Sequence, residues 1–197
     1  MLEKVGTGKI FSKVDLFSGY WQVPMHEPDI QKTAFCTASG LYEYLYMPMG
    51  LRNAGATFQR MMEEVLAPLL NKCCLVYLDD IAIYSPTEEQ HLQDLKDVFD
   101  LLDAAGLRMK VEKCEFFSKN MELLGFEINQ KGVGPQASKL QTIRDMKVLP
   151  TKTSIKSFLG LVRYYQRFVP CLSEKAVPLQ AMLKKDSTPK DWGPTQR

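Results

Sequence analysis

Three aspartates, Asp15, Asp79 and Asp80, have types and positions suited to metal chemistry. Asp15 comes at the end of an alternating apolar stretch, 11–16, and Asp79-Asp80 separate two short apolar runs, 73–78 and 81–84. If these stretches are neighbouring strands, the carboxylates converge, and carboxylate oxygens are ligands that Mg²⁺ prefers. Two such ions stabilise the attacking and leaving oxygens of an in-line phosphoryl transfer. The competing interpretation is ordinary turn chemistry, because Asp is common in tight turns.

The predicted hairpin has Asp79-Asp80 as its turn and both carboxylates at its tip. Adjacent strand residues point to opposite faces, so the two carboxylates cannot be equivalent inward ligands unless the turn twists them. We therefore rank Asp79 above Asp80.

The elements that must position these residues form an α+β pattern. Alternation and β-branched or aromatic content predict strands over 11–16, 107–111 and 121–128, the last interrupted at Gly125, a hairpin over 33–46 broken at Ser39-Gly40, and the hairpin over 73–84. Helical spacing of apolar residues predicts helices over 58–69, 138–146, 153–168 and 176–185. A further helix should begin at the capping box of Thr87 and Gln90, end before Gly106, and bury a stripe of Leu92, Leu95, Phe99 and Leu102.

Charge divides the chain. Residues 131–197 hold 13 Lys/Arg against 4 Asp/Glu, a formal charge of +9, whereas residues 1–130 hold 12 against 19, a charge of −7. One explanation of this charge distribution is a polyanion that binds to the basic part and reaches the carboxylates of the acidic part. A solvated basic helical surface explains the distribution equally well. Four basic residues fall near one face of the helix predicted over 153–168 and would contact phosphates: Lys152, Lys156, Arg163 and Arg167.

Composition argues against several protein classes. No run of 18 uncharged apolar residues occurs, and residues 1–4 lack the apolar core of a secretory signal, so we expect an intracellular protein that is neither secreted nor in contact with a membrane. The five cysteines are odd in number and include no C-x-x-C pair, which predicts buried free thiols rather than disulfides or a zinc site.

Eight motifs, in order along the chain, resemble those of reverse transcriptases of gypsy-type (Metaviridae-like) LTR retrotransposons. The most specific are residues 11–22 around Asp15, the Tyr-x-Asp-Asp box at 77–80, and residues 158–165. The others are residues 32–35, 47–51, 56–59, 113–116 and 124–126. A Tyr-x-Asp-Asp box alone is a weak signal, but eight ordered motifs over about residues 9–185 are a strong one.

The resemblance implies an α+β reverse-transcriptase fold. Its expected parts are a polymerase palm with a ferredoxin-like antiparallel sheet over 1–130, a partial fingers insertion at about 24–50, a basic helical thumb over 131–185, and a tail or linker over 186–197. The implied activity is that of an RNA-directed DNA polymerase, a nucleotidyltransferase within a retrotransposon Pol polyprotein. A primer 3′-hydroxyl attacks a deoxynucleoside triphosphate with the help of two Mg²⁺ ions, for which Mn²⁺ can substitute.

The implied partners are an RNA or DNA template with its primer and the deoxynucleoside triphosphates, with other Pol- or Gag-derived chains as further candidates. The implied location is the cytoplasm, in a virus-like particle, or the nucleus. We also expect the family's N-terminal fingers segment, whose basic residues hold the triphosphate, and its RNase H domain to lie outside this chain.

Site residues carry over from the resemblance by motif. Asp15, Asp79 and Asp80 match the metal-binding triad, and Tyr20 matches the aromatic residue that stacks under the sugar and excludes a 2′-hydroxyl. Lys113 is a candidate general acid, with an ordinary solvated lysine as the alternative. The remaining nucleotide positions are Leu16, Met49, Gly50 and Tyr77. Leu124, Gly125 and Phe126 match the primer grip, with a β-bulge as the structural alternative.

The chain departs from the family pattern at three positions. A basic residue is common at the place of Phe17, Phe is usual at the place of Met49, and Pro is usual at the place of Gly55, which should loosen the start of its helix. Two alternatives to an active polymerase stay open. One is a catalytically inactive nucleic-acid-binding remnant of a truncated retroelement, and the other is a fragment that needs further parts to fold and exposes apolar surface.

Overall fold

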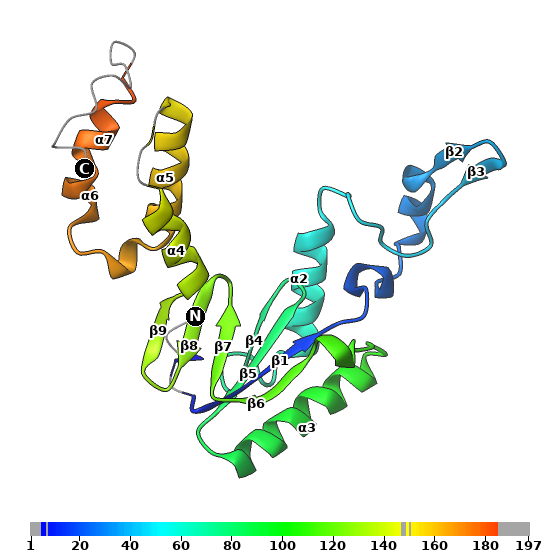
Figure 1. Cartoon of the computed structure of the whole chain (residues 1–197). Helices are drawn as coiled ribbons and strands as arrows, with labels where there is room; N and C mark the ends of the chain where they lie inside the picture. The colour runs from blue at the N-terminus through cyan, green and yellow to red at the C-terminus, as the bar shows by residue number, and fades with distance from the viewer. Residues whose placement is uncertain (1–4, 7, 147–148, 150, 185–197) are drawn as a thin grey trace. The chain divides into compact units, whose positions relative to one another are not determined.

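The computed structural model describes residues 5, 6, 8–146, 149 and 151–184 (Figure 1). The chain divides into two compact units. Unit 1 comprises Met1–Leu123 and Ile128–Val133, and unit 2 comprises Leu124–Glu127 and Gly134–Arg197. Among the described residues, no helix combines the length and the apolar character needed to cross a membrane.

A four-stranded antiparallel sheet of order β4-β5-β1-β6 lies at the centre of unit 1. Its strands are β1 (Ile10–Asp15), β4 (Cys74–Tyr77), β5 (Asp80–Ser85) and β6 (Glu115–Ser118). β1 pairs with β5 along its whole length, and this register places Asp15 opposite Asp80. The strand predicted over 11–16 and the hairpin predicted over 73–84 are therefore confirmed.

The β4–β5 turn lies one residue earlier than expected. Tyr77 pairs with Asp80, so Leu78 and Asp79 are the two turn residues, and Leu78 has a positive φ of 52°. Asp80 is consequently the first residue of a strand. The prediction that both carboxylates lie at the hairpin tip was wrong for Asp80.

Two helices bury apolar faces in the main core of unit 1. Phe58 and Met62 of α2 (Ala54–Val65) and Leu95 and Val98 of α3 (Glu88–Ala104) pack with Val14, Ile81 and Ile83 of the sheet. In Figure 1, α3 runs alongside the sheet strands. Thr87 caps α3 by accepting a bond from the Gln90 N–H at 3.2 Å, and Gly106 follows the helix with φ of 70°, as predicted.

The buried face of α3 differs from the predicted leucine stripe. Leu92 is 60% exposed, whereas its neighbour His91 is completely buried. The buried residues are His91, Asp94, Leu95, Val98 and Leu102. The face thus includes two polar residues, His91 and Asp94, where the sequence pattern favoured leucine.

The predicted hairpin over 33–46 is confirmed as β2 (Phe35–Thr37) and β3 (Gly40–Tyr42), preceded by the 3₁₀ helices η1 (Gly19–Gln22) and η2 (Glu27–Thr33). One other strand prediction was wrong. Residues 107–111 form only an isolated bridge from Met109 to Leu16, followed by η3 (Val111–Lys113). Residues 121–128 form β7 (Asn120–Leu123) and β8 (Phe126–Asn129), with the predicted interruption at Gly125.

The link between β7 and β8 is a tight turn. Leu124 and Gly125 have φ of 53° and 76°, and positive φ at both central residues is typical of a type I′ hairpin. β9 (Gly132–Pro135), which was not predicted, completes a three-stranded sheet of order β7-β8-β9. The segment is therefore neither a continuous strand nor a β-bulge.

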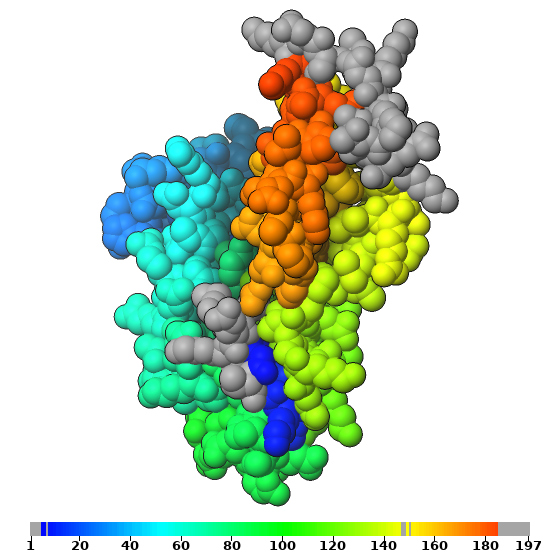
Figure 2. Space-filling model, turned by 90° about the vertical axis from the view of Figure 1, so that its left-hand side faces the viewer, coloured from blue at the N-terminus to red at the C-terminus, as the bar shows by residue number. Residues whose placement is uncertain are grey.

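Unit 2 contains α4 (Ala137–Asp145), α5 (Lys152–Tyr164), α6 (Leu172–Lys175) and α7 (Val177–Ala181). A capping box between Thr151 and Ser154 starts α5. Ile155 and Leu159 of α5 pack with Leu149, Ala176 and Met182 in a small core, and the side chains of α6 and α7 lie at the surface in Figure 2.

Two of the predicted helices in unit 2 were too long. The helix expected over 153–168 ends at Tyr164 and gives way to η4 (Gln166–Phe168). The helix expected over 176–185 is α7 alone, and its last expected residue lies outside the described residues.

Gly160→Ala should raise the free energy of unfolding of unit 2 by about 1 kcal/mol. Gly160 lies exposed inside α5, and an added Cβ would meet nothing within 4 Å. Urea unfolding checks this. Gly106→Ala is the matched control, since its surroundings are equally open but its φ of 70° should make alanine unfavourable. A shift of the same sign in both variants would contradict the prediction.

Tyr84→Phe should stabilise unit 1 by about 1 kcal/mol, because a buried hydroxyl without a partner carries a desolvation cost. Tyr84 is 5% exposed, and its hydroxyl has no hydrogen-bond partner in the described part of the chain. Thermal unfolding of the two chains measures the difference. A lower unfolding temperature for the variant would show that the hydroxyl has a stabilising partner.

Candidate nucleotide site

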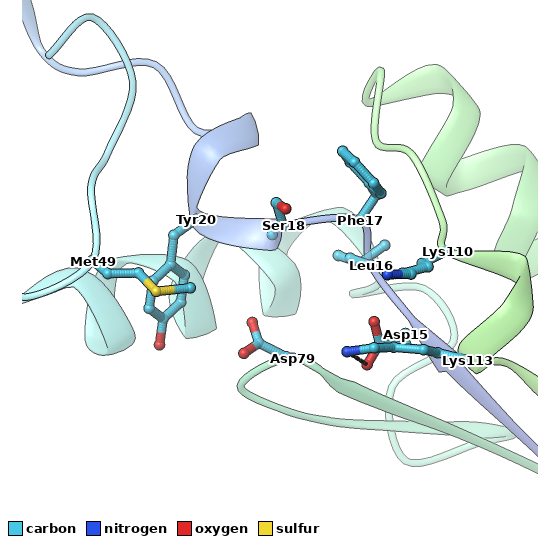
Figure 3. A pocket seen from close by; sticks show the side chains of 10 residues that line it. Asp15, Leu16, Phe17, Ser18, Tyr20, Met49, Asp79, Lys110 and Lys113 are labelled. Carbon is cyan, nitrogen blue, oxygen red and sulfur yellow. Dashed lines mark ion pairs between the residues drawn. The ribbon is translucent and has the colours of Figure 1, made fainter.

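A pocket opens in unit 1 where β1 ends (Figure 3). The chain after β1 supplies one wall, the β4–β5 turn supplies Asp79, and the segment after α3 supplies two lysines. The lining residues are Asp15, Leu16, Phe17, Ser18, Gly19, Tyr20, Met49, Asp79, Lys110 and Lys113. Six residues predicted from the sequence therefore meet here: Asp15, Leu16, Tyr20, Met49, Asp79 and Lys113.

The register of the sheet brings two carboxylates to this pocket. Asp15 ends β1 beside the β4–β5 turn that carries Asp79. Desolvation raises the pKa of Asp79 above its ordinary value, and the negative charges of Asp15 and Asp80 raise it further, against the opposing effect of Lys113. Burial and the two neighbouring carboxylates thus disfavour the charged form of Asp79, and a bound cation would favour it.

Asp80 has a different environment. Its Oδ1 atom lies 2.9 Å from the Nζ atom of Lys13, and it does not line the pocket. Lys13 precedes Asp15 by two residues on β1, so the two side chains share one face of the sheet. Across the described residues, no three His, Cys, Asp or Glu side chains are grouped as a metal site. Two members of the predicted triad line the pocket, and the third, Asp80, lies opposite Asp15 in the sheet and pairs with Lys13.

Two lysines line the pocket, Lys113, which was predicted, and Lys110, which was not. The Lys110 N–H donates to the Asp15 carbonyl oxygen at 2.9 Å, which fixes the segment after α3 to the end of β1. The Nζ atom of Lys113, the candidate general acid, lies 4.0 Å from Asp15 Oδ2. Lys110 and Lys13 were missed. The i, i+2 spacing of Lys13 and Asp15 could have revealed the latter, whereas no local pattern marks Lys110.

The loop after β1 is held by a glutamine. Gln22 Nε2 donates to the carbonyl oxygens of Phe17 and Arg108 at 2.8 and 3.0 Å, and its Oε1 atom accepts from the Arg108 N–H at 2.7 Å. Ser18, at the turn of this loop, has a positive φ of 51°. The hydrogen bonds of Gln22 maintain this sparsely populated backbone conformation, which persists only where the surrounding structure enforces it.

Tyr20 and Gly19 pack against the first turns of α2. The Tyr20 ring meets the buried Phe58 ring edge-on, with centroids 5.2 Å apart. A Cβ atom on Gly19 would lie 2.7 Å from Phe58 Cζ and 3.2 Å from Asp79 Oδ1. The absence of a side chain at Gly19 therefore lets the pocket wall, the helix and the Asp79 carboxylate come together.

Gly19→Ala should lower the free energy of unfolding of unit 1 by about 1–3 kcal/mol, the usual cost of overpacking. The added methyl must displace either Phe58 or Asp79. Gly55→Ala in α2 is the control, since its Cβ would make ordinary contacts with Leu78 and Tyr20 at 3.4 and 3.5 Å and should stabilise the helix. Urea unfolding of both variants tests the contrast, and equal effects would contradict it.

Two predicted nucleotide residues lie outside the pocket lining. Gly50 is exposed next to Met49 and has a φ of 95°, which favours glycine. Tyr77 ends β4 and is 45% exposed. The structure therefore places both near residues of the site without bringing them into the pocket itself.

Comparison with known proteins gives the family. Residues 1–128 match the model of the family described as "Reverse transcriptase (RNA-dependent DNA polymerase)". The chain belongs to the reverse transcriptase family. It is 45% identical, over 94% of its length, to the "Retrovirus-related Pol polyprotein from transposon 297" of Drosophila melanogaster, and 35% identical, over 95%, to that from transposon gypsy. It is also 35% identical over its full length to the "Transposon Tf2-3 polyprotein" of Schizosaccharomyces pombe.

The chain spans 18%, 18% and 15% of these three relatives. Among solved structures it is similar to the foamy viral protease-reverse transcriptase dRH in complex with ds DNA, with a TM-score of 0.86, 28% identity, and coverage of 95% of this chain and 33% of that one. It is also similar to the foamy viral protease-reverse transcriptase in complex with RNA/DNA hybrid, with a TM-score of 0.78, 28% identity, and coverage of 91% of this chain and 25% of that one. The predicted family and the α+β fold of a reverse transcriptase are thus confirmed.

Unit 2 of this reverse transcriptase chain carries the other predicted residues. Lys156 and Arg163 are exposed on α5, whereas Lys152 Nζ donates to the Lys184 carbonyl oxygen. Arg167 lies in η4, with its guanidinium 5.4 Å from the centre of the Phe168 ring. The four basic residues therefore do not lie on one helix, because α5 ends before Arg167. Leu124, Gly125 and Phe126 form the β7–β8 turn and the start of β8.

Proposed function

We propose that this chain is the polymerase part of a retrotransposon Pol polyprotein. It would add deoxynucleotides from their triphosphates to the 3′-hydroxyl of a primer paired with an RNA or DNA template. The observation that carries this proposal is the pocket that Asp15 and Asp79 both line at the end of β1, within a chain of the reverse transcriptase family. The relatives' complexes with ds DNA and RNA/DNA hybrid support a template-primer partner.

Asp15 and Asp79 fit a divalent cation, either Mg²⁺ or Mn²⁺, because both carboxylates line one pocket and carboxylate oxygens are ligands that these ions prefer. Asp80 is the third proposed ligand, and it would exchange its Lys13 partner for the metal. When bound, two such ions stabilise the attacking and leaving oxygens of the transfer.

The chain's own side chains would hold the nucleotide. Tyr20, supported by Phe58, would form the wall under the sugar, and Lys110 and Lys113 would place positive charge beside the phosphates. Lys113 is also the proposed general acid toward pyrophosphate. Leu16, Met49, Gly50 and Tyr77 would complete the surroundings of the nucleotide.

Each part of the chain has a proposed role in this reaction. The palm would extend over 1–130 with a fingers insertion at about 24–50, the thumb over 131–185, and a tail or linker over 186–197. Leu124, Gly125 and Phe126 would position the primer. Lys152, Lys156, Arg163 and Arg167 would contact duplex phosphates without reading sequence. The chain would work in a cytoplasmic virus-like particle or the nucleus, with other Pol- or Gag-derived chains as partners.

Extension of an oligo(dT) primer on poly(rA), with Mg²⁺ or Mn²⁺, tests this proposal. Binding of the same template-primer, measured across salt concentrations, runs alongside, because phosphate contacts make affinity fall with salt. Extension by the wild-type chain supports a polymerase. Tight, salt-sensitive binding without extension would leave an inactive nucleic-acid-binding remnant instead.

A further inference from the structure

Two tyrosine hydroxyls at the C-terminal end of α5 donate hydrogen bonds to the β7–β8 turn within unit 2. Tyr164 Oη donates to the Leu124 carbonyl oxygen at 2.5 Å, and Tyr165 Oη donates to the Gly125 carbonyl oxygen at 2.9 Å. The Gln136 N–H, at the start of α4, also donates to the Gly125 carbonyl, at 3.2 Å. Both carbonyls of this two-residue turn are therefore held by hydrogen bonds from outside the hairpin.

Aromatic packing restrains the same turn. Phe126 is 6% exposed and stacks on Tyr164, with ring centroids 5.2 Å apart and 20° between the planes. It also meets the Tyr165 ring edge-on at 5.5 Å. A Cβ atom on Gly125 would lie 3.1 Å from Tyr165 Oη, and its φ of 76° is one that side chains disfavour. Glycine therefore allows the close approach of the turn to Tyr165.

Holding the carbonyls also orients an amide. Because a peptide unit is planar and trans, the Leu124 carbonyl and the Gly125 N–H point in opposite directions. Because the Leu124 carbonyl accepts a hydrogen bond from the Tyr164 hydroxyl, the Gly125 N–H points away from this hydroxyl. The Gly125 N–H has no acceptor among the described residues. Such an N–H is a donor suited to a phosphate oxygen.

We propose that Tyr164 and Tyr165 are positioning residues for the polymerase reaction. They hold the Leu124-Gly125 peptide so that the Gly125 N–H is presented to a phosphate oxygen of the primer strand near its 3′ end. This inference rests on the proposed function, since it takes residues 124–126 as the segment that positions the primer. The tyrosines act through the turn and contact no substrate in this role.

The test is single-nucleotide extension by the wild-type chain and by Tyr164→Phe, Tyr165→Phe and the double variant, with kcat, the KM for the nucleotide and the Kd for template-primer measured separately. Each single change should lower kcat by about 3- to 10-fold, the usual worth of one hydrogen bond, and the double change by more. KM and Kd should change less than twofold, because the rings still pack on Phe126.

Two further measurements separate positioning from folding. Hydrogen exchange at the amides of residues 123–127 should accelerate in the double variant while α5 stays protected. Gly125→Ala, which presses on the Tyr165 hydroxyl from the side of the turn, should lower kcat in the same way. Tyr84→Phe is the matched control, because it removes a phenol hydroxyl that holds no carbonyl in the described chain and should keep the wild-type kcat.

An unchanged kcat in the double variant would overturn the inference. Equal losses in kcat and in template-primer affinity would also overturn it, because they would make the tyrosines general supports of unit 2. A wild-type chain that extends no primer would instead refute the proposed function, and this inference with it. The wild-type and variant arms thus distinguish the two failures.

Discussion

Asp79→Asn should slow primer extension by at least about 100-fold, because an amide replaces one of the two carboxylates that face the pocket and several kcal/mol of metal-dependent stabilisation are lost. Extension of a single nucleotide at saturating template-primer measures the effect. Asp100→Asn makes the same chemical change on the exposed surface of α3 and should keep the wild-type rate.

The stability of the same variant should change in the opposite direction. Asp79 has a raised pKa because of desolvation and its neighbours Asp15 and Asp80, so its charge opposes folding at neutral pH. In metal-free buffer, Asp79→Asn should therefore unfold at a temperature equal to or above that of the wild-type chain. Added Mg²⁺ should raise the unfolding temperature of the wild-type chain and have less effect on the variant, because ligands that bind the folded state stabilise it.

A loss of activity together with a loss of stability would point to a folding defect instead. Activity that survives Asp79→Asn would show that this pocket is not the reaction centre. Retained stability with lost activity is the result expected of a residue whose charge serves chemistry at a cost to the fold.

Local patterns in the sequence were sufficient for much of unit 1. The alternation around β1, the apolar runs of the β4–β5 hairpin and the Thr87 cap are signals carried by neighbouring residues, and each element formed where expected. The turn between β4 and β5 was misplaced by one residue. Composition favours Asp-Asp for a turn, but the register places Asp80 opposite Asp15 and forces Leu78 to a positive φ.

The features that sequence patterns missed depend on contacts between distant segments. Lys110 reaches the pocket because its N–H bonds to the carbonyl of Asp15, which lies far away in the chain. The end of α5 depends on similar contacts, since Tyr164 and Tyr165 bond to Leu124 and Gly125 while the apolar periodicity continues past them. Periodicity within a segment carries no information about such partners.

The buried polar residues of α3 illustrate the same limit. The predicted stripe of apolar residues begins at Leu92, but Leu92 is exposed. The face that the helix buries begins one residue earlier, at His91. A histidine and an aspartate are poor candidates for a core unless their hydrogen-bond partners are known. Those partners are Ser12 on β1 and Ser85 on β5, which no local rule connects to α3.

Ser85→Ala should lower the free energy of unfolding by roughly 2–4 kcal/mol, because the buried atoms Asp94 Oδ2 and His91 Nδ1 lose their partner while only the bonds of Asp94 to Gln90 and of His91 to Ser12 remain. Ser85 Oγ donates to Asp94 Oδ2 at 2.5 Å and lies 2.8 Å from His91 Nδ1. Since its proton is given to Asp94, Ser85 must accept from His91 Nδ1–H. Urea unfolding at pH 7 measures the cost, and Ser39→Ala on the exposed hairpin is the control that should change little.

The hydrogen bonds of His91 make the free energy of unfolding depend on pH. Burial favours the neutral ring, and with Nδ1 donating, the Nε2 atom of the neutral ring accepts from Ser12 Oγ at 2.7 Å. Burial lowers the pKa of His91, with Asp94 opposing, so the unfolded chain takes up the proton at a higher pH than the folded chain does. The stabilisation is complete above the unfolded pKa of about 6.5 and is lost as the pH falls through the lower, folded pKa.

The free energy of unfolding should therefore decrease from pH 7 to pH 5, and His91→Gln should remove most of this dependence while lowering stability at pH 7. The chain has two histidines, and the other, His26, is exposed beside Asp29, so His26→Gln is a matched control that should keep the acid sensitivity. Urea unfolding across this pH range distinguishes the two. An unchanged slope in His91→Gln would mean that another group takes up the proton, and the directional network around Ser85 would then not account for the acid response.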